Sequence, residues 1–153
     1  MIVYRLCKAN YRFDLSGKGA EKNGGRWNSK GTALIYTGQT RALCTTEIAV
    51  RTPLGIIPSD FHLVHIEFPD SIKVIEFASN KLPDNWNCFP HIDATQKIGD
   101  RFVKEGKQLV LKVPSSVVQG EFNYLINPFH EDSKKLSVIK TEPFKFDERL
   151  FKK

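Results

Sequence analysis

The chain has 153 residues and a mass of 17.4 kDa, a length that suits one compact domain, and we expect a single domain over residues 1–153. Its 41% of hydrophobic residues excludes an intrinsically disordered or collagen-like chain. The excess of 23 lysines and arginines over 17 acidic residues gives a net charge of +6, which suits nucleic acid, an anionic small molecule or an acidic protein partner equally well.

Membrane, secretory and metal-binding classes find little support. No run approaches the roughly 18 apolar residues that a membrane span needs, and residues 1–13 contain interrupting polar positions, so we expect neither an anchor nor a signal peptide and assign the chain to the cytoplasm. The three cysteines, Cys7, Cys44 and Cys88, have wide, unequal spacings unlike those of a disulfide framework or zinc site. We therefore expect buried or idle thiols and no metal.

The first half of the chain predicts a strand–turn–helix order. Residues 2–6 indicate a strand, and residues 16–31, rich in Gly, Ser and Lys, indicate a loop. Residues 33–37 form a short β-prone run. A helix then follows, with Thr40 as its N-cap and its end before Pro53.

The second half predicts further short strands around one helix. Residues 61–68 alternate in polarity as a strand does, and residues 71–77 are expected to pair with them through a turn at Pro69 and Asp70. Residues 80–91 indicate a loop, and residues 93–104 a helix capped by Asp93 and ended by Gly106. The remaining expected strands cover residues 108–113, 123–126, 136–140 and 144–146. Without regular βαβ alternation, the fold class is α+β with mainly antiparallel strands.

Glu47 is the most informative candidate for chemistry. In the predicted helix it shares an apolar stripe with Leu43 and Val50. A carboxylate on such a face is a catalytic group at the rim of the core, a surface residue at the edge of the stripe, or one partner of a buried ion pair with an arginine.

Two further candidates lie before the predicted helix. Arg26 follows two glycines, so its planar guanidinium can sit on a tight turn and clamp phosphate oxygens. A surface charge at Arg26 and a core anchor at Trp27 fit the pattern equally well. Tyr36 ends the preceding strand, where its ring can stack on a flat ligand or fill the core. Position alone leaves these alternatives open.

Three segments, taken in order, resemble the RES domain, a family named for its Arg, Glu and Ser. They read GGRWNSKG, LIYTGQTRALCTTEIAV and LVLKVPSSVVQGEFNYLINPFH. The resemblance runs from Tyr4 to about His130. It departs from the family pattern at Phe102, where many members carry a tryptophan.

The resemblance implies roles for particular residues. Carried over position by position, the family arginine falls on Arg26, its tyrosine on Tyr36, its glutamate on Glu47 and its serine on Ser115, with Ser116 as the adjacent alternative. These four would form the catalytic set. Further contacts to the substrate are expected from Arg5, Trp27 and Asn28.

The family resemblance also implies an activity and a fold. Members are toxins of bacterial toxin–antitoxin pairs with an ADP-ribosyltransferase-like fold, so it implies a split sheet, consumption of NAD as a substrate without a cofactor, and a helix-turn-helix antitoxin as partner. Cleavage of the nicotinamide–ribose bond leaves positive charge on the sugar, for which a fixed carboxylate at Glu47 is a natural stabiliser. Two alternatives remain: mono-ADP-ribosylation of a protein, and a non-enzymatic nucleic-acid-binding module.

Overall fold

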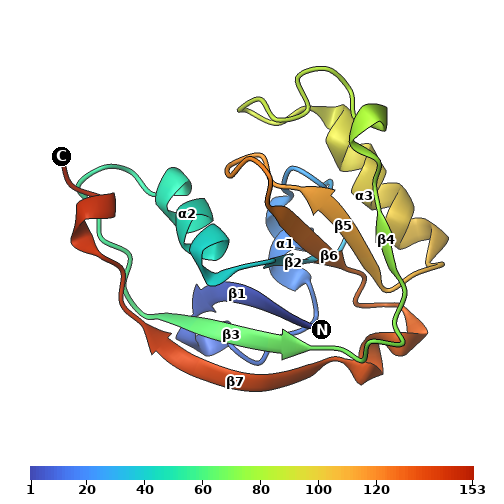
Figure 1. The fold of residues 1–153 in the computed structure, drawn as a ribbon, viewed down its shortest axis with the longest axis horizontal. Coiled ribbons are helices and arrows are strands. Elements are labelled where there is room, and N and C mark those ends of the chain that lie inside the picture. The colour runs from blue at the N-terminus through green and yellow to red at the C-terminus, as the bar shows by residue number, and fades with distance from the viewer.

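The computed structural model describes residues 1–153 and contains one seven-stranded sheet with three α-helices (Figure 1). The spatial strand order is β4-β5-β6-β2-β1-β3-β7, and every pairing except β4 with β5 is antiparallel. This confirms the α+β class with a mainly antiparallel sheet. The elements are β1 (Ile2–Lys8), α1 (Lys18–Asn23), β2 (Ile35–Gly38), α2 (Arg41–Arg51), β3 (Phe61–Glu67), β4 (Val74–Glu76), α3 (Asp93–Glu105), β5 (Val110–Pro114), β6 (Phe122–Ile126) and β7 (Ser137–Phe144).

The sheet is split between β1 and β2. These two strands share a single register pair, Tyr4 with Gly38, whereas β1 and β3 pair along the whole of both strands. Two half-sheets, β4-β5-β6-β2 and β1-β3-β7, therefore meet at one point and diverge beyond it. The expected split sheet is confirmed, and the divergence leaves room for a cleft.

Helix α2 begins where its N-cap predicts. The Thr40 hydroxyl accepts a hydrogen bond from the Leu43 amide at 3.0 Å and satisfies one of the free amides of the first turn. Leu43 and Cys44 are buried, but Val50 is 61% exposed. The expected stripe is thus wrong at its far end, because the last turn of α2 projects beyond the core.

The expected hairpin between residues 61–68 and 71–77 is wrong. β3 lies between β1 and β7, while β4 pairs in parallel with β5 at the opposite edge of the sheet. Asp70 instead binds the N-terminal ammonium at 2.8 Å. A turn signal shows only that the chain changes direction, and long-range packing chose the partner strand.

Three local expectations also needed correction. Helix α1 lies inside the expected 16–31 loop, between Gly17 and Gly24, both at positive φ, because six residues are too few to show a helical period. The N-cap of α3 is Ile92 rather than Asp93, although Gly106 ends the helix at φ 59° as expected. The two strands expected over 136–146 are the single strand β7.

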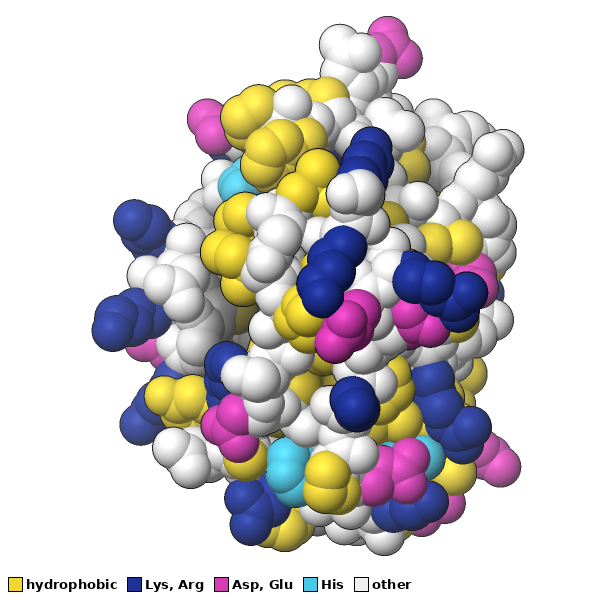
Figure 2. Space-filling model, turned by 90° about the vertical axis from the view of Figure 1, so that its left-hand side faces the viewer, with side chains coloured by type: hydrophobic (Ala, Val, Ile, Leu, Met, Phe, Trp, Pro, Cys, Tyr) yellow, Lys and Arg dark blue, Asp and Glu magenta, His cyan; other side chains and the backbone are white.

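The face of the molecule that carries α2 and the C-terminus has a mixed charge. Figure 2 shows lysine and arginine side chains interspersed with acidic ones on this face, without a continuous basic region. None of the helices combines the length and the apolar character required to cross a membrane.

Candidate active site

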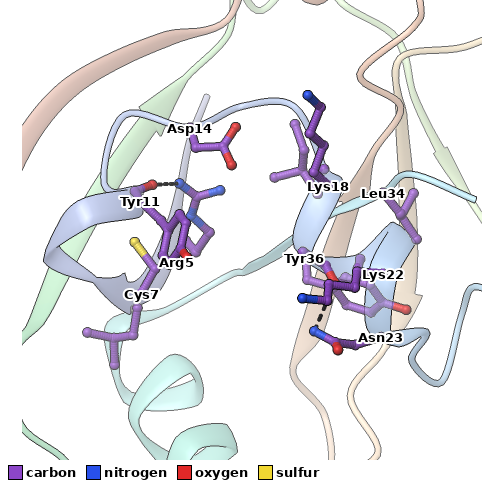
Figure 3. A pocket seen from close by; sticks show the side chains of 14 residues that line it. Arg5, Cys7, Tyr11, Asp14, Lys18, Lys22, Asn23, Leu34 and Tyr36 are labelled. Carbon is purple, nitrogen blue, oxygen red and sulfur yellow. Dashed lines mark hydrogen bonds between the residues drawn. The ribbon is translucent and has the colours of Figure 1, made fainter. Parts of the chain in front are cut away.

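Two adjoining cavities open where the half-sheets diverge. The larger, of about 610 Å³, lies among β1, α1 and β2 (Figure 3). The smaller, of about 80 Å³, lies among β1, β2 and α2. Both are lined by Arg5, Leu6 and Tyr36, so the two cavities meet along these three residues.

Glu47 lines the smaller cavity from α2, and its carboxylate is held in place. Its Oε1 accepts a hydrogen bond from Asn123 Nδ2 at 2.8 Å, and its Oε2 lies 3.8 Å from Arg51 Nη2. The Glu47 side chain is 19% exposed. A half-buried carboxylate with one fixed donor and one distant cation keeps acceptor capacity for a ligand.

Sequence reasoning allowed an arginine partner for Glu47 without identifying Arg51, and it missed Asn123. Arg51 also lines the smaller cavity, and its position one helical turn after Glu47 was a usable signal. Asn123 lies on β6, distant in sequence, and is buried. No local pattern links Asn123 to Glu47, because only the pairing of β6 with β2 brings it there.

Tyr36 lines both cavities while its hydroxyl is fixed from behind. The hydroxyl donates to Asn28 Oδ1 at 2.7 Å and accepts from the Trp27 amide at 3.0 Å. Burial is the main cause that raises its pKa, so the phenol stays protonated. The ring therefore has a fixed position in the wall of the cleft, which neither of the two expectations for Tyr36 described fully.

Arg26 lies near this cleft but lines neither cavity. Its Nη1 donates to the carbonyls of Trp86 at 2.7 Å and Cys88 at 2.9 Å. Burial is the main cause that lowers its pKa, the charge of Arg51 lowers the pKa further, and the Glu47 carboxylate raises it. Arg26 is therefore an electrostatic neighbour of the carboxylate, with one arm of its guanidinium committed to residues 86–88.

Trp27 and Asn28, expected as substrate contacts, are both buried inside the protein. The Trp27 ring belongs to a core cluster and lies 6.0 Å from the ring of Trp86. The Asn28 amide donates to three backbone carbonyls, those of Ala20, Ser29 and Thr32. Both residues hold the turn that carries Arg26, and neither lines either of the two cavities.

Ser115 is also occupied within the protein. Its Oγ accepts from the amides of Val117 and Val118, each at 3.0 Å, and the side chain is buried. It shapes the turn that leads into β6 and lines neither cavity. The adjacent Ser116 is half-buried, and its hydroxyl forms no hydrogen bond within the chain.

Helix α3 holds the Arg26 turn from outside, a role that the sequence did not indicate. Gln96 Nε2 donates to the carbonyls of Gly25 and Asn28, each at 3.1 Å. The Asp100 carboxylate accepts from the Ser29 amide at 2.9 Å and from its hydroxyl at 2.6 Å. Both ends of the turn are thus fixed to one helix.

The combined arrangement suits a substrate that carries negative charge and develops positive charge nearby. Arg5 stands at the junction of the cavities, where its Nη2 donates to the Tyr11 carbonyl at 2.9 Å and its buried Nε has no partner. The Glu47 carboxylate faces the same space from α2. Guanidinium groups bind phosphate oxygens, and a fixed carboxylate stabilises a cation.

Comparisons with known proteins identify the family and the fold of the chain. The RES domain family model matches residues 2–147. A "Prs ADP-ribosylating toxin" of Sphingobium sp. (strain YBL2) is 37% identical over 92% of this chain and 88% of that protein. A "Toxin Res" of Yersinia enterocolitica serotype O:8 is 36% identical over 98% of this chain and 99% of that protein. The crystal structure of the M. tuberculosis MbcT–MbcA toxin–antitoxin complex contains a chain with the same fold, with a TM-score of 0.75 and 20% identity over 98% of this chain and 86% of that one.

Proposed function

This chain belongs to the RES domain family, and on that premise we propose that it is a bacterial toxin that destroys NAD by cleaving the bond between nicotinamide and ribose. The names of the two bacterial relatives, both called toxins, support the biological role. The single observation that supports the proposed reaction is the position of the Glu47 carboxylate, which Asn123 fixes in the wall of the smaller cavity.

Departure of nicotinamide leaves an oxocarbenium-like charge on the ribose. A carboxylate that is already positioned stabilises this charge without reorganising during the reaction. Asn123 keeps one oxygen of Glu47 fixed at 2.8 Å, while the other oxygen faces the smaller cavity beside Arg51. Glu47 is therefore the residue to which we assign catalysis.

The other residues would bind and position the substrate. Tyr36, whose ring lines both cavities, can stack on the nicotinamide ring, and Arg5 at their junction can bind the pyrophosphate. Arg26 holds the segment at residues 86–88 through one nitrogen and has further donors available for the substrate. Ser115 would act through the turn that precedes β6, and Ser116 offers the free hydroxyl.

Product analysis tests the proposal. Purified protein is incubated with NAD in buffers with and without inorganic phosphate, and the products are separated by chromatography. We expect nicotinamide in both, with free ADP-ribose if water is the acceptor and a phosphorylated ADP-ribose if phosphate is. Intact NAD after prolonged incubation without a protein acceptor would contradict a degrading activity.

Mono-ADP-ribosylation of a protein is the second candidate, because the Sphingobium relative is named an ADP-ribosylating toxin. The same carboxylate would serve both reactions. Incubation with adenine-labelled NAD and a bacterial lysate separates them: transfer predicts a labelled protein band, while degradation predicts label only in small products.

An antitoxin partner follows from the proposed role, and we propose a helix-turn-helix protein that covers the cleft. The chain of the same fold comes from a toxin–antitoxin complex. Co-expression of the protein encoded by the neighbouring gene is expected to restore both growth and the cellular NAD level. The nucleic-acid-binding alternative predicts binding that weakens steeply with salt and persists in Glu47→Gln.

A further inference from the structure

The larger cavity has no role in the chemistry assigned above to the smaller one. At about 80 Å³ the smaller cavity is too small for a whole dinucleotide, since pockets for drug-sized ligands measure roughly 300–1,000 Å³. The larger, at about 610 Å³, lies in that range and joins the smaller at Arg5 and Tyr36. A ligand that reaches Glu47 from this side must pass through it.

The walls of the larger cavity carry mainly positive charge. Arg5 from β1 and Lys18 and Lys22 from α1 line it, and Asp14 is the one carboxylate among the lining residues. Figure 3 shows Arg5, Tyr11 and Asp14 on one side of the cavity and Lys18, Lys22 and Tyr36 on the other.

These cations have few partners within the chain. Lys18 and Lys22 lie one turn apart on α1, so their charges are close together. Neither lysine forms a salt bridge with a carboxylate of the chain. Arg5 uses Nη2 on the Tyr11 carbonyl, while its buried Nε lacks a partner. The hydrogen bond to Tyr11 is the only one that the Arg5 side chain forms within the chain, so its guanidinium keeps Nη1 as a donor for phosphate oxygens.

An aromatic side chain stands beside this group of cations. Tyr11 lies in the 3-10 helix Ala9–Tyr11, lines the cavity and is 60% exposed. The hydrogen bond from Arg5 fixes its backbone, so its ring is presented next to the anion-binding groups. Exposed aromatic rings beside cations bind nucleobases by stacking.

We propose that the larger cavity binds the adenosine-phosphate half of the dinucleotide, with Arg5 on the pyrophosphate, Lys18 and Lys22 on the phosphate nearest adenosine, and Tyr11 under the purine. This inference rests on the proposed function for the identity of the whole substrate. The cavity itself recognises an adenine nucleotide, so AMP alone is a ligand for it.

Calorimetry with AMP tests the cavity directly. We compare the purified wild type with Lys18→Glu/Lys22→Glu, with Tyr11→Ala and with Lys97→Glu. Lys97 is an exposed lysine of α3 that lines neither cavity, and its variant serves as a control for a change of lysine charge. Loss of two charged contacts is expected to weaken AMP binding more than about tenfold, and loss of the ring about fivefold, while Lys97→Glu stays within about twofold of the wild type.

The kinetics of NAD cleavage supply a second measurement. The variants at positions 11, 18 and 22 are expected to raise KM for NAD about tenfold with little change in kcat, because they lie away from the reacting bond. Inhibition by nicotinamide, which lacks adenosine, is expected to be unchanged. Thermal melting checks that each variant is folded.

The two proposals fail separately in these experiments. If the wild type cleaves NAD but AMP does not bind at up to about 5 mM, or binds every variant equally, the assignment of the larger cavity is wrong and the proposed function stands. If AMP binds as described and NAD is not cleaved, the proposed function fails while the nucleotide site remains.

Discussion

At the scale of single residues, the carboxylate of Glu47 decides the proposed chemistry. Glu47→Gln keeps the size of the side chain and an oxygen that can accept from Asn123, so the fold is expected to be preserved. Because the amide carries no charge to stabilise the sugar cation, kcat for NAD loss should fall at least about 10²–10³-fold. NAD loss by chromatography and melting by circular dichroism measure the two effects.

Glu105→Gln is the matched control for this variant. Glu105 ends α3 and pairs with Lys107 at 3.8 Å on the surface, outside both cavities. Its kcat should equal that of the wild type. Normal toxicity or normal NAD loss in Glu47→Gln would refute the catalytic assignment.

In the proposed mechanism Asn123 would act through Glu47, as a positioning residue. Asn123→Ala removes the hydrogen bond of 2.8 Å to the carboxylate, which is then free to move. Hydrogen bonds to charged groups contribute about 1.5–3 kcal/mol, so we expect kcat to fall roughly 10- to 100-fold with KM nearly constant. Steady-state kinetics measure this split.

Asn80→Ala is the control for the loss of an amide. Asn80 is exposed and lines neither cavity, so its kinetics should match the wild type. A rise in KM without a fall in kcat for Asn123→Ala would show that Asn123 contributes to binding rather than to the position of Glu47.

At the scale of elements, α3 fixes the turn that carries Arg26. A Cβ placed on Gly99 would overlap the Trp27 carbonyl oxygen, so Gly99→Ala must push the helix away from the turn. Overpacking of this kind costs about 1–3 kcal/mol. We expect a lower Tm in calorimetry, by roughly 2–4 °C per kcal/mol, and reduced NAD cleavage as Arg26 loses its position.

Gly19→Ala makes the same chemical change on α1 without a steric conflict. Nothing lies within 4 Å of a Cβ at Gly19, and its φ is not in the left-handed region. Alanine favours a helix over glycine by about 1 kcal/mol, so its Tm should equal or exceed that of the wild type. Equal stability losses in both variants would remove the argument that α3 must approach Trp27 closely.

At the scale of the whole molecule, buried ionisable groups limit stability in alkaline solution. Burial, followed by the nearby Glu47 carboxylate, raises the pKa of Cys44 from 9.0 to about 12. The unfolded chain therefore ionises first, so the stability from this group is complete below pH 9 and is lost as pH rises toward 12. Between pH 8 and pH 10.5, Cys44 alone is expected to lower the free energy of unfolding by about 2 kcal/mol.

Denaturant unfolding of the wild type and Cys44→Ser at pH 8 and pH 10.5 tests this effect. The variant lacks the titrating thiol, so its free energy of unfolding should fall less over this interval. Burial also raises the pKa of Cys7, and this contribution remains in both proteins. Parallel losses would show that folding does not raise the pKa of Cys44.

The split of the sheet explains why a small chain can hold a two-part cleft. Each half-sheet is stabilised by its own strand pairings, and the two share one register pair between β1 and β2. The cavities open beside this junction, and the residues that line them come from both sides. The site therefore depends on how the halves meet and on no single segment.

The sequence by itself determined the features that depend on near neighbours. Thr40 marks the start of α2 because its side chain bonds an amide three residues later, and Glu47 follows two turns on at the inner face of that helix. The RES segments likewise identified the family. These signals span only a few residues, so local spacing was sufficient.

Only the tertiary structure decided the features that join distant segments. Asn123 reaches Glu47 across 76 positions of sequence, and Arg26 binds the carbonyls of residues 86 and 88 rather than lining a cavity. β4 paired with β5 instead of with its neighbour β3. Such contacts follow from the pairing order of the strands, which is set by the packing of the whole core and leaves no mark in the local pattern of residues.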